Sequence, residues 1–390
     1  MLFADSLVAL DVKTGRRKWH YQTVHHDMWD WDLPCAPILF DMQMNGRTIK
    51  AIAQPTKHAF LFVLNRETGE PIWPIEERPV PQSDAPKERS SPTQPFPTKP
   101  APFDRQGITE NDLIDLTPEL KAQALDVAKR YKMGPLFTPP VVSSLDGPLG
   151  TLQVPSDVGG ANWPGGSFDP ESNSLYIHSH TNVYVSGLLP ANPQQSDMGY
   201  IGGQARAGGA GAGGAPGAAG RGRGQAGGGR GAGAGGGPAF EGGGGGRGAT
   251  VQGLPLLKPP YDRITAYNMN TGDIIWQKTH SSTPDEITNH PALRSLNLPR
   301  LGQPGRTFIG TLTTKALVIA GEGGVHTNEA GKRVALLRAY DKRTGEDVGA
   351  VEMSNKQTGS PMTYTIDGKQ FIVLAVSGND GAEILAYALP

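Results

Sequence analysis

Short apolar runs separated by polar turns recur along the chain, and one such pattern returns four times. Each copy places a strand-length apolar run before an Asp or Asn, then a Thr-Gly pair, then a second run. The Asp or Asn and the Thr hydrogen-bond a tight turn, and the glycine supplies a positive φ. The pattern therefore predicts an antiparallel strand–turn–strand unit in each copy. The copies lie at residues 7–19, 62–73, 265–276 and 338–345.

Three of the four copies end in a tryptophan at a constant distance from the turn. These are Trp19, Trp73 and Trp276, while Gly349 stands where the fourth tryptophan would be. Helical periodicity is nearly absent from the chain. A repeated strand–turn–strand with a docking tryptophan is typical of propeller blades, so we predict an all-β propeller. Further short strands are expected at residues 49–53, 174–178, 316–320, 371–375 and 384–388.

The second and third copies lie far apart, and two insertions explain much of the distance. Residues 79–140 are proline-rich at their ends and hold one helical stretch over 117–131, with Thr117 as N-cap and Pro118 at the first helical position. Residues 202–248 are almost wholly Gly and Ala with scattered Arg, so we expect them to be disordered. The predicted divisions are 1–78 (blades with the polar loop described below), 79–140, 141–201 (one blade), 202–248 and 249–390 (C-terminal blades).

The Gly-rich tract also permits two sharper interpretations. Its Arg-Gly pairs resemble nucleic-acid-binding tails, but aromatic stacking partners are nearly missing. Its glycine spacings mimic a dinucleotide-binding fingerprint, but no strand precedes them and no amphipathic helix follows. We interpret the tract as a flexible surface insertion.

Composition narrows the class of protein further. A formal net charge of −1 argues against nucleic acid as a partner of the main body. Cys35 is the only cysteine, so no intrachain disulfide forms. No apolar run approaches the length of a membrane span, and the first residues contain neither a basic nor an apolar signal region, so we expect no export signal.

The candidate chemistry begins in residues 25–34, which combine two histidines, three carboxylates and two tryptophans. Acids set among indoles lie in a reduced dielectric, which raises their pKa and suits them to proton transfer. An alternative is a loop whose Asp side chains cap turns while its Trp rings pack. Of these acids we select Asp30. Lys57 follows one blade later and could share a site with it, although a solvated turn lysine is the simpler interpretation.

Asn162 and Trp163 form a third candidate, placed just before two glycines at the start of the next blade. An Asn-Trp pair in such a loop could line a flat aromatic ligand. The alternative is a tryptophan in the core of a blade, and the residues alone leave both interpretations open.

These motifs resemble those of the quinoprotein dehydrogenases that use pyrroloquinoline quinone (PQQ), nearest to their glucose dehydrogenase branch. The resemblance rests first on residues 23–34 and on Pro55-Thr56-Lys57 ahead of Phe62-Val63-Leu64. Residues 92–96, 137–140, 162–163 and 360–364 support it. The matching segments cover most of the chain outside the Gly-rich tract, and they resemble the C-terminal part of the family propeller.

The resemblance implies an eight-bladed propeller with PQQ on its axis beside a Ca²⁺ ion. It implies that Asp30 is the general base, that Lys57 hydrogen-bonds the reactive quinone carbonyl, and that Asn162 and Trp163 lie on the cofactor-binding loop. A base must stay ionised yet poorly solvated, and a cation must stabilise charge on the quinone oxygen. A sugar or polyol is the implied substrate, a respiratory quinone or cytochrome the electron acceptor, and the periplasm the location.

By the same resemblance the chain begins inside a blade, as an N-terminally truncated fragment. We therefore expect about four blades in an open arc, with the Ca²⁺ ligands in the missing part and little turnover by this chain alone. Two other classes remain as alternatives. One is a non-catalytic PQQ-like propeller that serves as an assembly scaffold, which would lack an acid-rich axial loop. The other is an arginine-glycine RNA binder, whose affinity would depend on salt and on residues 202–248.

Overall fold

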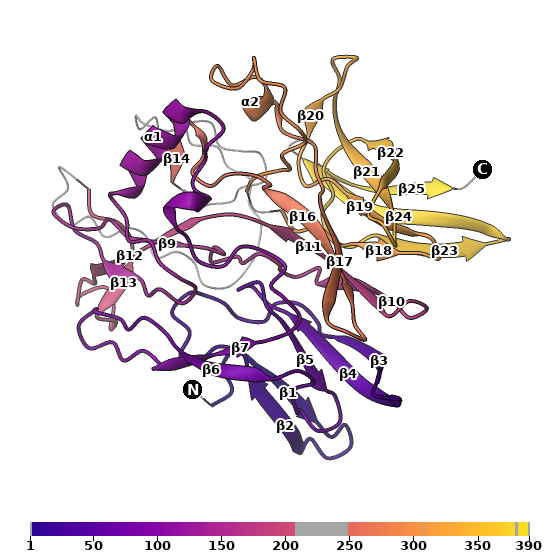
Figure 1. The fold of residues 1–390 in the computed structure, drawn as a ribbon, viewed down its shortest axis with the longest axis horizontal. Helices are drawn as coiled ribbons and strands as arrows, with labels where there is room; N and C mark the ends of the chain where they lie inside the picture. The colour runs from indigo at the N-terminus through magenta and orange to yellow at the C-terminus, as the bar shows by residue number, and fades with distance from the viewer. Residues whose placement is uncertain (1, 207–248, 306, 379–380, 389–390) are drawn as a thin grey trace.

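Strands dominate the computed structural model, which describes residues 2–206, 249–305, 307–378 and 381–388. The predicted all-β class is confirmed. The disorder predicted over 202–248 concerns residues that lie outside this description from residue 207 onward. Figure 1 shows the sheets following one another from the N-terminal hairpin to the C-terminal sheet. Among the described strands no sheet closes on itself.

The N-terminal part contains three antiparallel sheets of two or three strands. Their strands are β1 (Ser6–Leu10) with β2 (Arg17–Gln22); β3 (Ile38–Met44), β4 (Arg47–Pro55) and β5 (Leu61–Asn65); and β6 (Ile75–Pro79) with β7 (Thr93–Pro97).

The middle of the chain forms one four-stranded antiparallel sheet in the order β10-β11-β16-β17, flanked by smaller sheets. The four strands are β10 (Gly166–Asp169), β11 (Ser174–His180), β16 (Asp262–Asn268) and β17 (Asp273–Thr279). The smaller sheets use β8 (Val141–Val142), β9 (Thr151–Gln153), β12 (Tyr184–Pro190), β13 (Tyr200–Gly202), β14 (Thr250–Val251) and β15 (Leu254–Pro255). The β8–β12 pair is parallel.

Two sheets complete the C-terminal part. The first has five strands: β18 (Leu312–Thr313), β19 (Leu317–Gly321), β20 (His326–Thr327), β21 (Arg333–Asp341) and β22 (Asp347–Met353). The second has three: β23 (Met362–Ile366), β24 (Lys369–Gly378) and β25 (Gly381–Ala388). The described sheets thus hold two to five strands each.

The repeat turns form as their sequence predicts. In the first copy the Asp11 carboxylate accepts the backbone N–H groups of Lys13 and Thr14, and Gly15 has φ +67°. In the second copy Asn65 accepts two backbone N–H groups in the same way. These backbone N–H groups have no backbone carbonyl to donate to in a tight turn, so the Asp or Asn side chain accepts them instead. This is why an Asp or Asn opens every copy.

Each repeat tryptophan docks on the turn glycine of the next copy. A Cβ on Gly69 would lie 2.7 Å from the Trp19 ring, and one on Gly345 would lie 2.6 Å from the Trp276 ring. The Trp276 indole N–H also donates to the Lys342 carbonyl at 3.1 Å. Glycine is required at these turns by both its positive φ and the indole above it. The docking places consecutive copies side by side.

The second and third copies obey the same rule despite their separation in sequence. A Cβ on Gly272 would lie 3.1 Å from the Trp73 ring, and Gln43 N–H donates to Asn270 Oδ1 at 2.9 Å. The two sheets are therefore neighbours, and the long segment between them makes an excursion before it returns in β10 and β11 of the second sheet.

This excursion contains the helix predicted over residues 117–131, which the structure confirms as α1 (Pro118–Ala128). The Thr117 hydroxyl accepts the Leu120 N–H at 3.2 Å as an N-cap. The buried face of α1 is Leu120, Ala124 and Ala128, which pack in a cluster with residues of β14 and β15. Shorter helical turns are η1 (Glu110–Asp112) and α2 (Asp285–Thr288).

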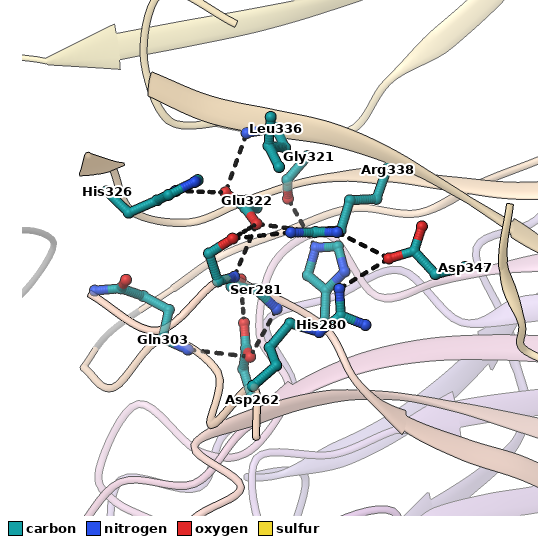
Figure 2. A network of polar contacts seen from close by, with 12 residues as sticks. Asp262, His280, Ser281, Gln303, Gly321, Glu322, His326, Leu336, Arg338 and Asp347 are labelled. Atoms are coloured by element: carbon teal, nitrogen blue, oxygen red, sulfur yellow. Dashed lines mark hydrogen bonds and ion pairs between the residues drawn. The ribbon is translucent and has the colours of Figure 1, made fainter. Parts of the chain in front are cut away.

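A buried polar network joins the middle sheet to the five-stranded sheet (Figure 2). Glu322, at the end of β19, accepts the Arg338 Nε at 2.9 Å and the Ser282 N–H at 2.8 Å. Asp262 accepts the Ser281 and Gln303 backbone N–H groups, each at 3.1 Å. Every carboxylate in this network is hydrogen-bonded, as burial of a charge requires.

Candidate functional site

The loop between β2 and β3 is anchored by its two tryptophans. The Trp29 indole N–H donates to the Thr138 carbonyl at 2.9 Å, and the Trp31 indole N–H donates to the Ser156 carbonyl at 3.0 Å. Their rings stack with centroids 5.4 Å apart, and Phe137 packs edge-on against both. The indoles are buried, so the loop is held by groups far away in sequence.

Asp30 lies between the two anchored tryptophans with its backbone in the left-handed region, at φ +63°. Its side chain is 71% exposed. Partial burial nevertheless raises the pKa of Asp30 above its ordinary value, while Lys57 opposes the rise and the charges of Asp32 and Asp157 add to it. A carboxylate in this setting is a stronger base than a fully solvated one.

Lys57 lies in the tight turn between β4 and β5, and the structure brings it to Asp30. Its ammonium donates to the Asp30 carbonyl at 2.7 Å, the Asp30 carboxylate at 3.3 Å and the Asp32 carboxylate at 2.5 Å. Only 7% of the side chain is exposed. The alternative of a solvated turn lysine is therefore wrong.

The loop that carries Asn162 packs directly on Lys57. Gly160 N–H donates to the Lys57 carbonyl at 2.8 Å, and a Cβ on Gly159 would lie 2.4 Å from the Lys57 Cα. Asn162 itself is buried, with Nδ2 donating to the Val158 carbonyl at 2.7 Å and Oδ1 accepting the Trp163 N–H. The backbones of the two segments are thus in contact.

Asn162 also lines a small depression whose other residues include His178 and Thr307. The buried Thr307 hydroxyl has no hydrogen-bond partner among the described residues. Trp163, next along the chain, is 76% exposed. The alternative of a blade-core tryptophan is therefore wrong.

Three further acids and a histidine of this site were not selected from the sequence. Asp32 is the closer carboxylate partner of Lys57, and the alternation Trp-Asp-Trp-Asp was a usable signal for it. Asp27 accepts backbone N–H groups on both sides of Asp30. Burial raises the pKa of Asp5 to about 6, with the charges of Asp27, Asp32 and Asp30 adding to the rise. Asp5 lies outside the motif, so no local pattern marks it.

His58 follows Lys57 and is fully buried against Trp31, Phe60, Phe62 and Phe137. Neither of its ring nitrogens has a hydrogen-bond partner within the described ranges. Burial lowers the pKa of His58 to about 3, so the imidazole is neutral and acts as part of the aromatic support under the turn.

The described residues contain no group of three or more His, Cys, Asp or Glu side chains arranged to hold a metal ion. None of their helices is long and apolar enough to cross a membrane.

Comparison with known proteins identifies the class. The family model for the β-propeller domain of PQQ-dependent glucose, ethanol and alcohol dehydrogenases matches residues 1–372. The chain belongs to this family of PQQ propeller proteins, which confirms the resemblance carried by residues 23–34.

The names of similar curated proteins specify several different hydroxyl compounds as substrates. The quinoprotein glucose dehydrogenase of Escherichia coli (strain K12) is 30% identical over 100% of this chain and 44% of its own length. The probable quinate dehydrogenase (quinone) of Xanthomonas campestris pv. juglandis is 30% identical over 100% and 45%. The glycerol dehydrogenase large subunit of Gluconobacter thailandicus is 30% identical over 99% and 49%. The chain therefore spans less than half the length of each of these relatives.

A solved structure shares the fold at lower sequence identity. The quinohemoprotein alcohol dehydrogenase of Comamonas testosteroni is 20% identical, with a TM-score of 0.50 over 97% of this chain and 39% of that one.

Proposed function

We propose that this chain forms part of a PQQ-dependent dehydrogenase that oxidises a hydroxyl group of a sugar or polyol. The observation that carries the proposal is the convergence of Lys57 with Asp30 and Asp32 on the motif loop. Family membership supplies the cofactor, and the names of the relatives favour a small polyhydroxylated substrate.

In this proposal Asp30 is the general base. Its exposed carboxylate accepts the proton of the substrate hydroxyl, and partial burial raises its pKa above the ordinary value. PQQ, when bound, supplies the quinone that accepts the hydride. Lys57 places a fixed positive charge beside the site, held in place by three oxygen acceptors, and this charge stabilises negative charge on a neighbouring oxygen.

The chemistry of the side chains present suits a flat, anionic quinone. Lys57 supplies a cation, Asn162 an amide, Trp163 an exposed indole face, and Thr307 a buried hydroxyl without a partner among the described residues. Calcium is inferred from family membership alone, because the described part of the chain offers no cluster of metal ligands. No step is assigned to that ion.

At the level of the whole protein, we propose about four blades of an eight-bladed propeller, with the divisions predicted from the sequence. The docking of Trp19, Trp73 and Trp276 on successive turns supports consecutive blades. A respiratory quinone or a cytochrome as acceptor and a periplasmic location belong to the same proposal, by family.

The rival function, a non-catalytic assembly scaffold, has less support. A scaffold function does not require a nearly buried lysine paired with two acids on a surface loop. The Lys57–Asp30–Asp32 arrangement therefore favours the enzyme.

The test supplies PQQ, Ca²⁺, glucose and an artificial electron acceptor to the 390-residue chain. The same assay is run on a chimera in which this chain replaces the matching part of the Escherichia coli relative. PQQ-dependent acceptor reduction that disappears in Asp30→Asn is the expected result, since Asn retains the left-handed backbone but cannot accept the proton. Absence of PQQ-dependent turnover in both proteins would reject the proposal.

A further inference from the structure

The Asp27 carboxylate accepts hydrogen bonds from the backbone on both sides of Asp30. Its Oδ1 accepts the Trp29 N–H at 2.8 Å and its Oδ2 accepts the Trp31 N–H at 2.6 Å. One carboxylate thus bonds to the backbone on both sides of Asp30, whose own side chain is exposed. We call this pair of hydrogen bonds the Asp27 bracket. Both oxygens are used, so neither a hydroxyl nor an amide side chain could make the same pair of bonds.

The bracket explains the backbone conformation at Asp30. A non-glycine residue at φ +63° is uncommon and costs conformational energy. The flanking N–H groups point inward to Asp27, and the Asp30 carbonyl points to the Lys57 ammonium at 2.7 Å. Contacts on both sides of the residue therefore determine its conformation.

The surrounding contacts make the bracket rigid. Gln153 Nε2 donates to the Trp29 carbonyl at 2.8 Å, in addition to the bonds that anchor both indoles. Asp27 is partly buried, which shields its bonds to the two N–H groups from water. A charge-assisted bond in such a setting is stronger than a neutral one.

From this geometry we infer that Asp27 is a positioning residue of the active site, which holds the Asp30 carboxylate and carbonyl in place relative to Lys57. The inference rests on the proposed function for the role of Asp30 but not for the bracket itself. Asp27 touches neither substrate nor cofactor in this account, and it acts through the backbone of Asp30.

The test compares Asp27→Asn with Asp11→Asn in the 390-residue chain. Asp11 accepts its two backbone N–H groups through one oxygen, so Asn can keep both bonds. Asn at position 27 can keep only one of two. Amide hydrogen exchange in a peptide over residues 28–32 should accelerate about tenfold or more in Asp27→Asn, with no change in Asp11→Asn. Asp27→Ala, which loses both acceptors, should exchange faster still.

Activity provides the second measurement. In the Escherichia coli chimera with PQQ, Ca²⁺ and glucose, Asp27→Asn should lower kcat about tenfold or more while KM stays within about twofold. Unchanged exchange over 28–32 would overturn the inference, as would unchanged kcat in a protein whose Asp30→Asn variant is inactive. Accelerated exchange over the whole chain would also overturn it, because it would reveal a general structural role. If Asp30→Asn retains turnover, the proposed base fails by itself, and the exchange measurement still decides whether the bracket exists.

Discussion

At the scale of single residues, burial and neighbouring charges together shift the pKa of Asp30. Burial raises the pKa of Asp30, the Lys57 ammonium lowers it, and the Asp32 carboxylate raises it again. The pKa of the proposed base therefore depends on Asp32, a neighbour that pairs with the same lysine.

Replacement of Asp32 by Asn should move the pH dependence of turnover in a defined direction. Loss of the Asp32 charge removes one cause of the raised pKa and leaves Lys57 more available to Asp30, so the pKa of Asp30 falls. The acid limb of kcat/KM should then shift to lower pH by about half a unit or more. A shift to higher pH would mean that Asp32 does not act on Asp30 as a neighbouring charge.

At the scale of elements, the repeat tryptophans connect each strand–turn–strand unit to the next. Trp276 packs on Gly345 and hydrogen-bonds the Lys342 carbonyl, whereas Trp163 is exposed. Replacing each of these tryptophans by alanine therefore distinguishes the contribution of a tryptophan that docks on a turn from that of one that does not.

Trp276→Ala should lower the free energy of unfolding by about 3–5 kcal/mol, because a large buried ring leaves a cavity behind. Trp163→Ala should change it by no more than about 0.5 kcal/mol. Urea unfolding followed by circular dichroism measures both. Equal losses in the two variants would show that docking on the glycine turn contributes nothing specific.

The elements also show what a sequence can and cannot predict. The turns, their Asp or Asn side chains and helix α1 were predictable because each depends on neighbours within a few residues. Sheet membership was not, since β11 pairs with β16, which follows much later in the chain. At the site, Asp30 and Lys57 were found through the motif, but the hydrogen bonds of Asp27 and the raised pKa of Asp5 depend on contacts that only the fold creates.

At the scale of the whole molecule, buried titratable groups make the fold sensitive to acid. Burial lowers the pKa of His180 and of His280 to about 4, and that of His58 to about 3. The pKa of Glu322 is lowered to about 2 by its hydrogen bonds and the Arg338 charge, which outweigh the effect of burial.

These shifts fix the sign of the pH dependence. Each folded pKa lies below its unfolded value, so the unfolded chain binds more protons. The free energy of unfolding therefore decreases as the pH is lowered. The histidines destabilise the fold progressively from about pH 6.5 down to about pH 4, and Glu322 adds to this from about pH 4.5 downward. The free energy of unfolding should drop by at least about 2 kcal/mol between pH 7 and pH 4.

His58→Phe tests one of these groups separately. The imidazole has no hydrogen-bond partner in the described part of the chain and lies among aromatic rings, so Phe loses no bond there. At pH 7 the change in stability should stay below about 1.5 kcal/mol, whereas at pH 4 the variant should gain relative to the parent. Parallel stability curves for the two proteins from pH 7 to pH 4 would contradict the low pKa of His58.

The most direct test of the central claim is the effect of Asp30→Asn on PQQ-dependent oxidation of glucose in the Escherichia coli chimera. Asp30 pairs with Lys57 at 3.3 Å, and Asn preserves its size and its left-handed backbone while removing its basicity. We expect a loss of about 10²–10⁴ in kcat, with PQQ binding retained. Full turnover by the Asp30→Asn chimera would contradict it.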